Sequence, residues 1–214
     1  MYTVEAKSIY KEFKNEIVLN NVNFHLEQGE ICGIVGRNGS GKSIFLKMVA
    51  GLIIPDEGEI FIKGEKLKKG DYAKNIGVLL DCTGFLPGYS AMENLISLAQ
   101  IRNVIGKEEI EEILNRVGLD PSSKKPYRKF SLGMKQKLAI AQAFMEKPEL
   151  LLLDEPMNSL DEDSVEDMRQ FIQDYVKENN ASVILTSHNS EDIDALCANV
   201  YEIKKKTFVL QNGE

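Results

Sequence analysis

An apolar run that ends in a glycine-rich loop is the feature that most constrains the fold. Residues 31–35 read Ile-Cys-Gly-Ile-Val, and residues 36–43 continue with Gly-Arg-Asn-Gly-Ser-Gly-Lys-Ser. A continuous apolar run of this kind is typical of a strand buried on both faces of a parallel sheet. Apolar residues then recur at helical spacing from Phe45 to Val49, and Gly51 ends the pattern. The order of strand, glycine loop and helix predicts an α/β fold.

The loop also fits the pattern G-x-x-x-x-G-K-[ST]. Its glycines allow successive backbone N–H groups to point at phosphate oxygens, and the helix that follows directs its positive end to the same place. In this pattern Lys42 neutralises the β- and γ-phosphates, and the Ser43 hydroxyl binds Mg²⁺. The predicted nucleotide-binding residues of this segment are Gly36, Arg37, Asn38, Gly39, Ser40, Gly41, Lys42, Ser43 and Ile44.

The rest of the chain alternates between strands and helices, with one helical interruption. Residues 150–153, 182–186 and 200–203 read as strands, and the apolar spacing between residues 91 and 145 is mostly helical. The length of 214 residues suits one large domain or one domain with an inserted lobe. We expect a single domain over residues 1–214. Its core and β subdomain would cover 1–81 and 148–214, with an inserted helical subdomain at 82–147.

Two carboxylates, Asp154 and Glu155, follow the apolar run 150–153. In α/β folds ligands bind at the carboxyl ends of the strands. Asp154 is therefore predicted to hold Mg²⁺ through water. Glu155 is predicted to orient and deprotonate the attacking water as a general base.

The composition limits which partners and which cellular compartment are expected. The formal net charge is -7, and an acidic surface argues against broad binding to nucleic acid or anionic lipid. The three cysteines, Cys32, Cys82 and Cys197, are odd in number and unpatterned, which favours free thiols in a reducing cytosol. The N-terminus has no signal-peptide pattern, and no run approaches 18 apolar residues.

A third motif, residues 130–136, reads Phe-Ser-Leu-Gly-Met-Lys-Gln. Together with residues 18–24, 36–43, 153–161 and 186–188, it resembles the ATP-binding subunits of ATP-binding cassette (ABC) transporters over the whole chain. The resemblance implies a P-loop NTPase (RecA-like) core with an antiparallel β subdomain and an inserted α-helical subdomain. It also implies ATPase activity with ATP and Mg²⁺ as cofactors.

The resemblance assigns roles to further residues. Phe13 stands where an aromatic ring stacks on adenine, with Tyr10 as the competing aromatic. His188 matches the histidine that contacts the γ-phosphate and the general base, so the expected catalytic set is Lys42, Glu155 and His188.

Other assignments concern a second chain. Ser131, Gly133 and Met134 correspond to the segment that contacts the γ-phosphate of a nucleotide bound by the other subunit. Residues 159–161 resemble the loop that runs along the dimer interface. The expected unit is a homodimer that closes on ATP.

Two positions depart from the family pattern. Leu132 replaces the first of two glycines that usually follow the serine. Asp81 replaces a glutamine that reaches Mg²⁺ and the attacking water, and an ionised aspartate cannot donate a hydrogen bond. Asp81 either touches the metal through a water or loses this contact. The expected metal ligands are Ser43, Asp154 and Asp81.

The resemblance also implies a membrane partner. Phe85, Leu86 and Tyr89 lie in a Gly/Pro-rich stretch, and in the family the region 82–92 receives a separate transmembrane permease subunit. The acidic residue at position 81 and the residues 131–134 are similar to ATPases of bacitracin and lantibiotic exporters. We therefore expect an ATPase that powers the export of antimicrobial peptides or drugs, with no nucleic acid partner. It would be cytoplasmic and peripheral to the inner face of the membrane.

Three alternatives remain open at this level. The chain could serve an ABC importer, because compact importer ATPases without an extra regulatory domain exist. It could act on ribosomes or DNA, as some soluble relatives do. It could also be a nucleotide-gated binding module with weak hydrolysis, given Asp81 and Leu132.

Overall fold

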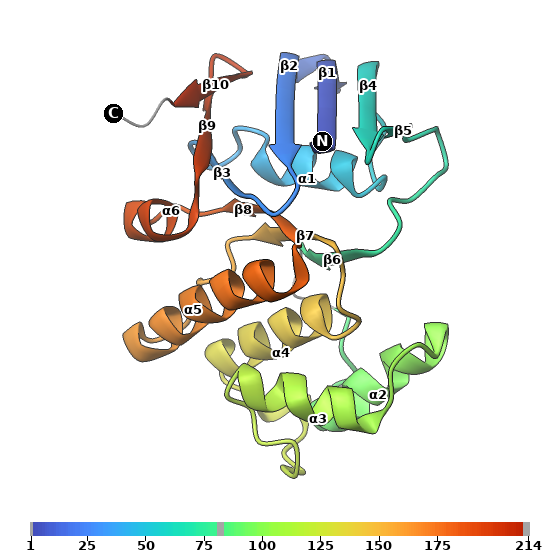
Figure 1. Cartoon of the computed structure of the whole chain (residues 1–214), viewed down its shortest axis with the longest axis vertical. Helices are drawn as coiled ribbons and strands as arrows, with labels where there is room; N and C mark the ends of the chain where they lie inside the picture. Colours follow the sequence, from blue (N-terminus) through green and yellow to red (C-terminus); the bar gives the residue numbers. More distant parts are fainter. Residues whose placement is uncertain (1, 81–83, 212–214) are drawn as a thin grey trace.

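The computed structural model describes residues 2–80 and 84–211, so the predictions for Asp81 and Cys82 lie outside the described residues. Within those ranges the strands form two sheets (Figure 1). The strands are β1 (Tyr2–Phe13), β2 (Glu16–Glu27), β3 (Ile31–Val35), β4 (Glu57–Ile62), β5 (Glu65–Lys66), β6 (Ile76–Leu79), β7 (Leu150–Asp154), β8 (Ser182–Thr186), β9 (Asn199–Lys204) and β10 (Thr207–Gln211).

One sheet is antiparallel and has the strand order β2-β1-β4-β5. The other has the order β10-β9-β3-β8-β7-β6, in which every pair from β9 to β6 is parallel and β10 pairs antiparallel to β9. The parallel arrangement brings the carboxyl ends of β3, β7 and β8 to one edge. The glycine loop follows β3, the two carboxylates lie at the end of β7, and residues 186–188 lie at the end of β8, so they meet at that edge.

The helices lie on both faces of the larger sheet. They are α1 (Lys42–Val49), α2 (Ala91–Arg102), α3 (Lys107–Arg116), the short 3₁₀ helix η1 (Tyr127–Lys129), α4 (Leu132–Phe144), α5 (Glu162–Asn179) and α6 (Ser190–Leu196). Figure 1 shows α1 between the two sheets, and α4 and α5 on the opposite face of the larger sheet, with α2 and α3 beyond them. No helix in the described ranges is long and apolar enough to cross a membrane.

Strand β7 shows why its sequence is apolar throughout. Leu150 and Leu152 are buried in the core that contains α1. Leu151 and Leu153 are buried in the other core, with α4 and α5. Because successive side chains of a strand point to opposite faces, a strand between two cores needs apolar residues at every position.

Three segments differ from the sequence-based expectation. Strand β5 lies between the segments 59–63 and 76–80, where the sequence predicts a lysine-rich turn, and β10 comes after 200–203, the last strand that the sequence predicts. The sequence also predicts a helix over residues 191–198, but α6 ends at Leu196 because Cys197 has extended backbone angles. The division at residues 82 and 147 into core and inserted subdomain stays a prediction.

Candidate active site

The glycine loop joins β3 to α1 and depends on its glycines at particular positions. Gly36, Gly39 and Gly41 have φ angles of 156°, 75° and 111°, which residues with a side chain rarely adopt. A Cβ atom on Gly41 would also lie 2.9 Å from Leu19 Cδ2. The loop therefore packs against β2, with its backbone curled ahead of the first turn of α1.

A hollow of about 370 Å³ opens beside this loop. We call it the loop hollow, and it is lined by Asn38, Gly39, Ser40, Gly41, Lys42, Ser43, Ile44, Asp154, Glu155, Asn158 and His188. Three separate strand ends thus contribute to one cavity. Gly36 and Arg37 line a neighbouring hollow of about 720 Å³ on the other side of His188.

Lys42 is buried, and its amine reaches back across the loop. The Nζ atom donates to the Gly36 carbonyl at 2.8 Å and lies 3.4 Å from His188 Nε2. Burial lowers the pKa of Lys42, while the negative charges of Glu155 and Asp154 act in the opposite direction. The cation therefore has little water around it and faces the carboxylates.

The hydroxyl of Thr186 fixes the two carboxylate residues relative to each other. Thr186 Oγ1 donates to Asp154 Oδ1 at 2.6 Å and accepts from the Glu155 backbone N–H at 3.0 Å. Thr186 is fully buried at the end of β8, beside Asp154 in the parallel register. One hydroxyl thus orients the Asp154 side chain and the Glu155 backbone together.

Glu155 has a strained backbone that a buried glutamine supports. Its φ angle is 51°, in the left-handed region, and such a conformation costs about 1–3 kcal/mol in a residue with a side chain. Gln136 Nε2 donates to the Glu155 carbonyl at 3.1 Å and to the Pro156 carbonyl at 2.9 Å. Helix α4 therefore holds the turn that carries Glu155.

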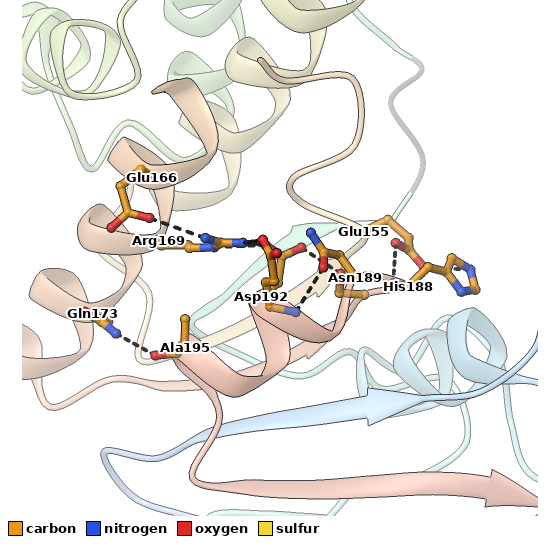
Figure 2. Close-up of polar contacts among 10 residues, drawn as sticks. Glu155, Glu166, Arg169, Gln173, His188, Asn189, Asp192 and Ala195 are labelled. Carbon is orange, nitrogen blue, oxygen red and sulfur yellow. Dashed lines mark hydrogen bonds and ion pairs between the residues drawn. The ribbon is translucent and has the colours of Figure 1, made fainter. Parts of the chain in front are cut away.

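The Glu155 side chain meets His188 at the edge of the loop hollow (Figure 2). Glu155 Oε2 accepts the His188 backbone N–H at 3.3 Å, and Oε1 lies 3.0 Å from His188 Nε2. Oε1 is nevertheless buried without an aligned hydrogen-bond donor among the described residues. Burial raises the pKa of Glu155, although His188 and Lys42 partly oppose this. The carboxylate thus lies against His188 with little water around it.

Mg²⁺ would find suitable donors in the same place. Ser43 and Asp154 both line the loop hollow, and they supply a hydroxyl and a carboxylate oxygen. Mg²⁺ prefers oxygen ligands and usually binds through one or two protein groups together with phosphates. The residues present fit this ion.

The remaining predicted residues lie away from the loop hollow. Phe13 is 42% exposed at the end of β1, with Lys11 Nζ 5.0 Å from its ring centre. Ser131 is exposed and caps α4, because its Oγ accepts from the Met134 N–H at 3.2 Å. None of Phe13, Ser131, Gly133 and Met134 lines the hollow of its own chain.

Gly133 lies against Ser159, in the segment 159–161 that is predicted to run along a dimer interface. A Cβ atom on Gly133 would lie 2.9 Å from the Ser159 backbone carbonyl. Only a glycine allows the start of α4 to approach that carbonyl so closely. Leu132, which replaces the other glycine, is 70% exposed and meets no such restriction.

Sequence reasoning missed three contributors to this site. They are the Thr186 hydroxyl, Gln136 and Asn158. Gln136 belongs to the motif 130–136 and Thr186 to the motif 186–188. The sequence therefore includes both residues in its motifs but does not show which groups they hydrogen-bond. Asn158 lies between Glu155 and residues 159–161 and carried no separate signal.

Comparisons with known proteins identify the family to which this fold belongs. A family model described as "ABC transporter" matches residues 19–158. A second model, described as "AAA domain, putative AbiEii toxin, Type IV TA system", matches residues 124–194, about a third of the chain.

Curated relatives belong to the same class. The Bacillus subtilis ABC transporter ATP-binding protein YybJ is 42% identical over 91% of this chain and 89% of its own length. The Bacillus licheniformis bacitracin transport ATP-binding protein BcrA is 38% identical over 92% of this chain and 65% of its own length. The Streptococcus pyogenes lantibiotic transport ATP-binding protein SrtF is 32% identical over 90% of this chain and 83% of its own length. The chain thus spans slightly less than two thirds of the BcrA protein.

Solved structures show the same fold. A bacterial ABC transporter cassette solved as a dimer has a TM-score of 0.86 and 25% identity, and it covers 99% of this chain and 100% of its own length. The same cassette, solved as a dimer in a post-hydrolysis state bound to ADP and Pi, matches equally well. These matches confirm the P-loop NTPase fold that the sequence predicts. The chain belongs to the ABC transporter family, as an ATP-binding subunit with ATPase activity.

Proposed function

We propose that this chain binds ATP on residues 36–44 and hydrolyses it with Glu155 as the general base. The observation that carries the proposal is that Glu155 lines the loop hollow together with Lys42 and His188, with its Oε1 3.0 Å from His188 Nε2. A raised pKa makes the carboxylate a better proton acceptor near neutral pH. Lys42 and His188, which meet at 3.4 Å, complete the catalytic set.

The reaction follows from these positions. Glu155 takes a proton from a water, whose oxygen attacks the γ-phosphorus. The bond from that phosphorus to the β,γ-bridging oxygen breaks, so ADP and phosphate leave. Lys42 would neutralise charge that builds on the phosphate oxygens, and His188 would hold the γ-phosphate against the base.

Mg²⁺ would be held by Ser43 and Asp154, and it would neutralise charge on the β- and γ-phosphates. The Thr186 hydroxyl keeps Asp154 oriented for this contact. Asp81 is a further candidate ligand, and it lies outside the described residues.

The active unit would be a dimer of two identical chains. Ser131 caps the 13-residue helix α4, and Gly133 and Met134 lie in its first turn. Ser131 and Leu132 are exposed, and none of these residues lines the loop hollow of its own chain. A helix N-terminus attracts anions, so this segment suits the γ-phosphate held by the other chain. The dimeric solved cassette supports the arrangement. Phe13, the exposed last residue of β1, would stack on adenine.

A separate permease would be the membrane partner, contacted through the region 82–92. Leu86 and Tyr89 are 46% and 45% exposed there, whereas Phe85 packs on Tyr127, with 5.2 Å between the centres of the two rings. The relatives named for bacitracin and lantibiotic transport support an exporter of antimicrobial peptides. The chain would then sit in the cytoplasm, at the inner face of the membrane.

Single-turnover hydrolysis of radiolabelled ATP tests the catalytic assignment. Glu155→Gln should still bind ATP, while its turnover falls by about 10²- to 10⁴-fold because the general base is lost. Glu178→Gln, a change at an exposed glutamate on α5, should hydrolyse ATP like the wild type. Equal turnover in the wild type and Glu155→Gln would refute Glu155 as the base.

A further inference from the structure

An ion pair between a partly buried arginine and a buried aspartate joins helices α5 and α6 next to the active site (Figure 2). Arg169 of α5 donates to Asp192 Oδ1 of α6 from Nε at 3.0 Å and from Nη2 at 2.7 Å. The side chains of Arg169 and Asp192 are only 14% and 3% exposed. A carboxylate buried this deeply needs a charged partner and further hydrogen bonds, so the pair fixes the position of both helices.

The second oxygen of the same carboxylate leads towards His188. Ser187 Oγ donates to Asp192 Oδ2 at 2.8 Å, and it accepts the Asn189 backbone N–H at 3.0 Å. The serine hydroxyl therefore ties the backbone on both sides of His188 to α6. Asn189 in turn caps α6 by accepting the Glu191 N–H at 2.9 Å.

His188 depends on this backbone for its position. Its side chain is 46% exposed, so the core does not hold the ring in place. Its contacts with Lys42 and Glu155, at 3.4 Å and 3.0 Å, lie inside the site and involve groups that would engage the substrate. The Ser187 hydroxyl and Asp192 hold the segment from the other side.

We propose that Ser187, Asp192 and Arg169 are positioning residues that set the place of His188 against Lys42 and Glu155. The inference rests on the catalytic role given to His188 above. Misplacing a reacting group by about 1 Å can cost about 100-fold in rate, so a lost hydroxyl behind His188 should slow hydrolysis. Binding of ATP should change little, because the proposed function places ATP on residues 36–44.

The central variant is Ser187→Ala in the full chain. We expect its kcat for ATP to fall about tenfold, with KM within about twofold of wild type. Gln173→Leu is the matched control, because Gln173 also joins α5 to α6, through a 2.8 Å hydrogen bond to the Ala195 carbonyl, without reaching Ser187. This control should keep the wild-type kcat. A wild-type kcat in Ser187→Ala would overturn the proposal.

Variants of His188 separate this inference from the proposed function. In the His188→Ala background, adding Ser187→Ala should leave kcat unchanged within about twofold, because the hydroxyl acts through His188. A further tenfold loss in that double variant would show another route and overturn the positioning role. If His188→Ala alone keeps full activity, the role of His188 in the proposed function fails. Asp192→Asn should mimic Ser187→Ala, and if it does not fold, the Ser187 series decides alone.

Discussion

At the scale of single residues, the site depends on hydroxyl and amide groups that take no part in the chemistry. The Thr186 hydroxyl holds Asp154 and the Glu155 N–H, and Gln136 holds the Glu155 carbonyl. Glu155 could not keep its strained φ angle of 51° without such support. The two acids that would bind Mg²⁺ and activate water are therefore placed by neighbours on β8 and α4.

Thr186→Val tests this support with almost no change in shape. The valine leaves the partly buried Glu155 N–H without its acceptor and Asp154 without its donor, so the free energy of unfolding should fall by about 1–3 kcal/mol. ATP turnover should fall as well, because Asp154 loses its orienting donor. Urea unfolding and steady-state hydrolysis measure the two effects.

Thr207→Val provides the comparison for that variant. Thr207 donates to the Asn21 carbonyl at 3.2 Å in an exposed position, so its loss should change stability by less than about 0.5 kcal/mol. If both valine variants unfold at the same urea concentration, the Thr186 hydroxyl does not support the site.

At the scale of elements, the contact between the start of α4 and Ser159 decides whether Gly133 is replaceable. Alanine in place of glycine gains at most about 1 kcal/mol of helix propensity. A Cβ 2.9 Å from a backbone carbonyl forces the backbone to shift, which typically costs about 1–3 kcal/mol. Gly133→Ala should therefore lower the free energy of unfolding by about 1 kcal/mol, as measured in urea.

Gly88→Ala serves as its control. Nothing lies within 4 Å of a Cβ built on Gly88, and its φ angle is not positive. The isolated chain should therefore tolerate that alanine. A stability loss of equal size in both variants would mean that the Ser159 contact is not the cause.

The elements also show how far the sequence alone predicts the molecule. The loop from Gly36 to Ser43 and the acids that follow β7 were predictable, because glycine spacing and strand ends are local patterns. The Arg169–Asp192 pair was not, because it depends on how α5 packs on α6. The two-residue β5 has no apolar alternation and is defined only by pairing with β4.

At the scale of the whole molecule, the proposed shared site predicts a nucleotide-dependent dimer. Glu155→Gln should retain ATP and sediment as a dimer with Mg²⁺ and ATP, and as a monomer without nucleotide. Adding Ser131→Glu should abolish the dimer, because it places a carboxylate against the partner's γ-phosphate. Sedimentation velocity over a range of protein concentrations measures this.

Ser122→Glu, in the same Glu155→Gln background, is the control for Ser131→Glu. Ser122 is exposed in the loop before η1, where it donates to Asp120 at 2.7 Å, so dimer formation should persist. A monomeric Glu155→Gln protein at saturating ATP would contradict the shared site.

Strand β7 lies between the two cores, and its end carries Asp154 and Glu155. Loosening either core exposes leucines of this strand, so the two acids cannot separate from the rest of the sheet by a small local opening. The amide hydrogens of β7 should then exchange with solvent only through global unfolding, whereas those of residues 84–89, which lie in no helix or strand, would exchange through local opening. Asp154 and Glu155 would thus stay fixed to the sheet while residues 84–89 open.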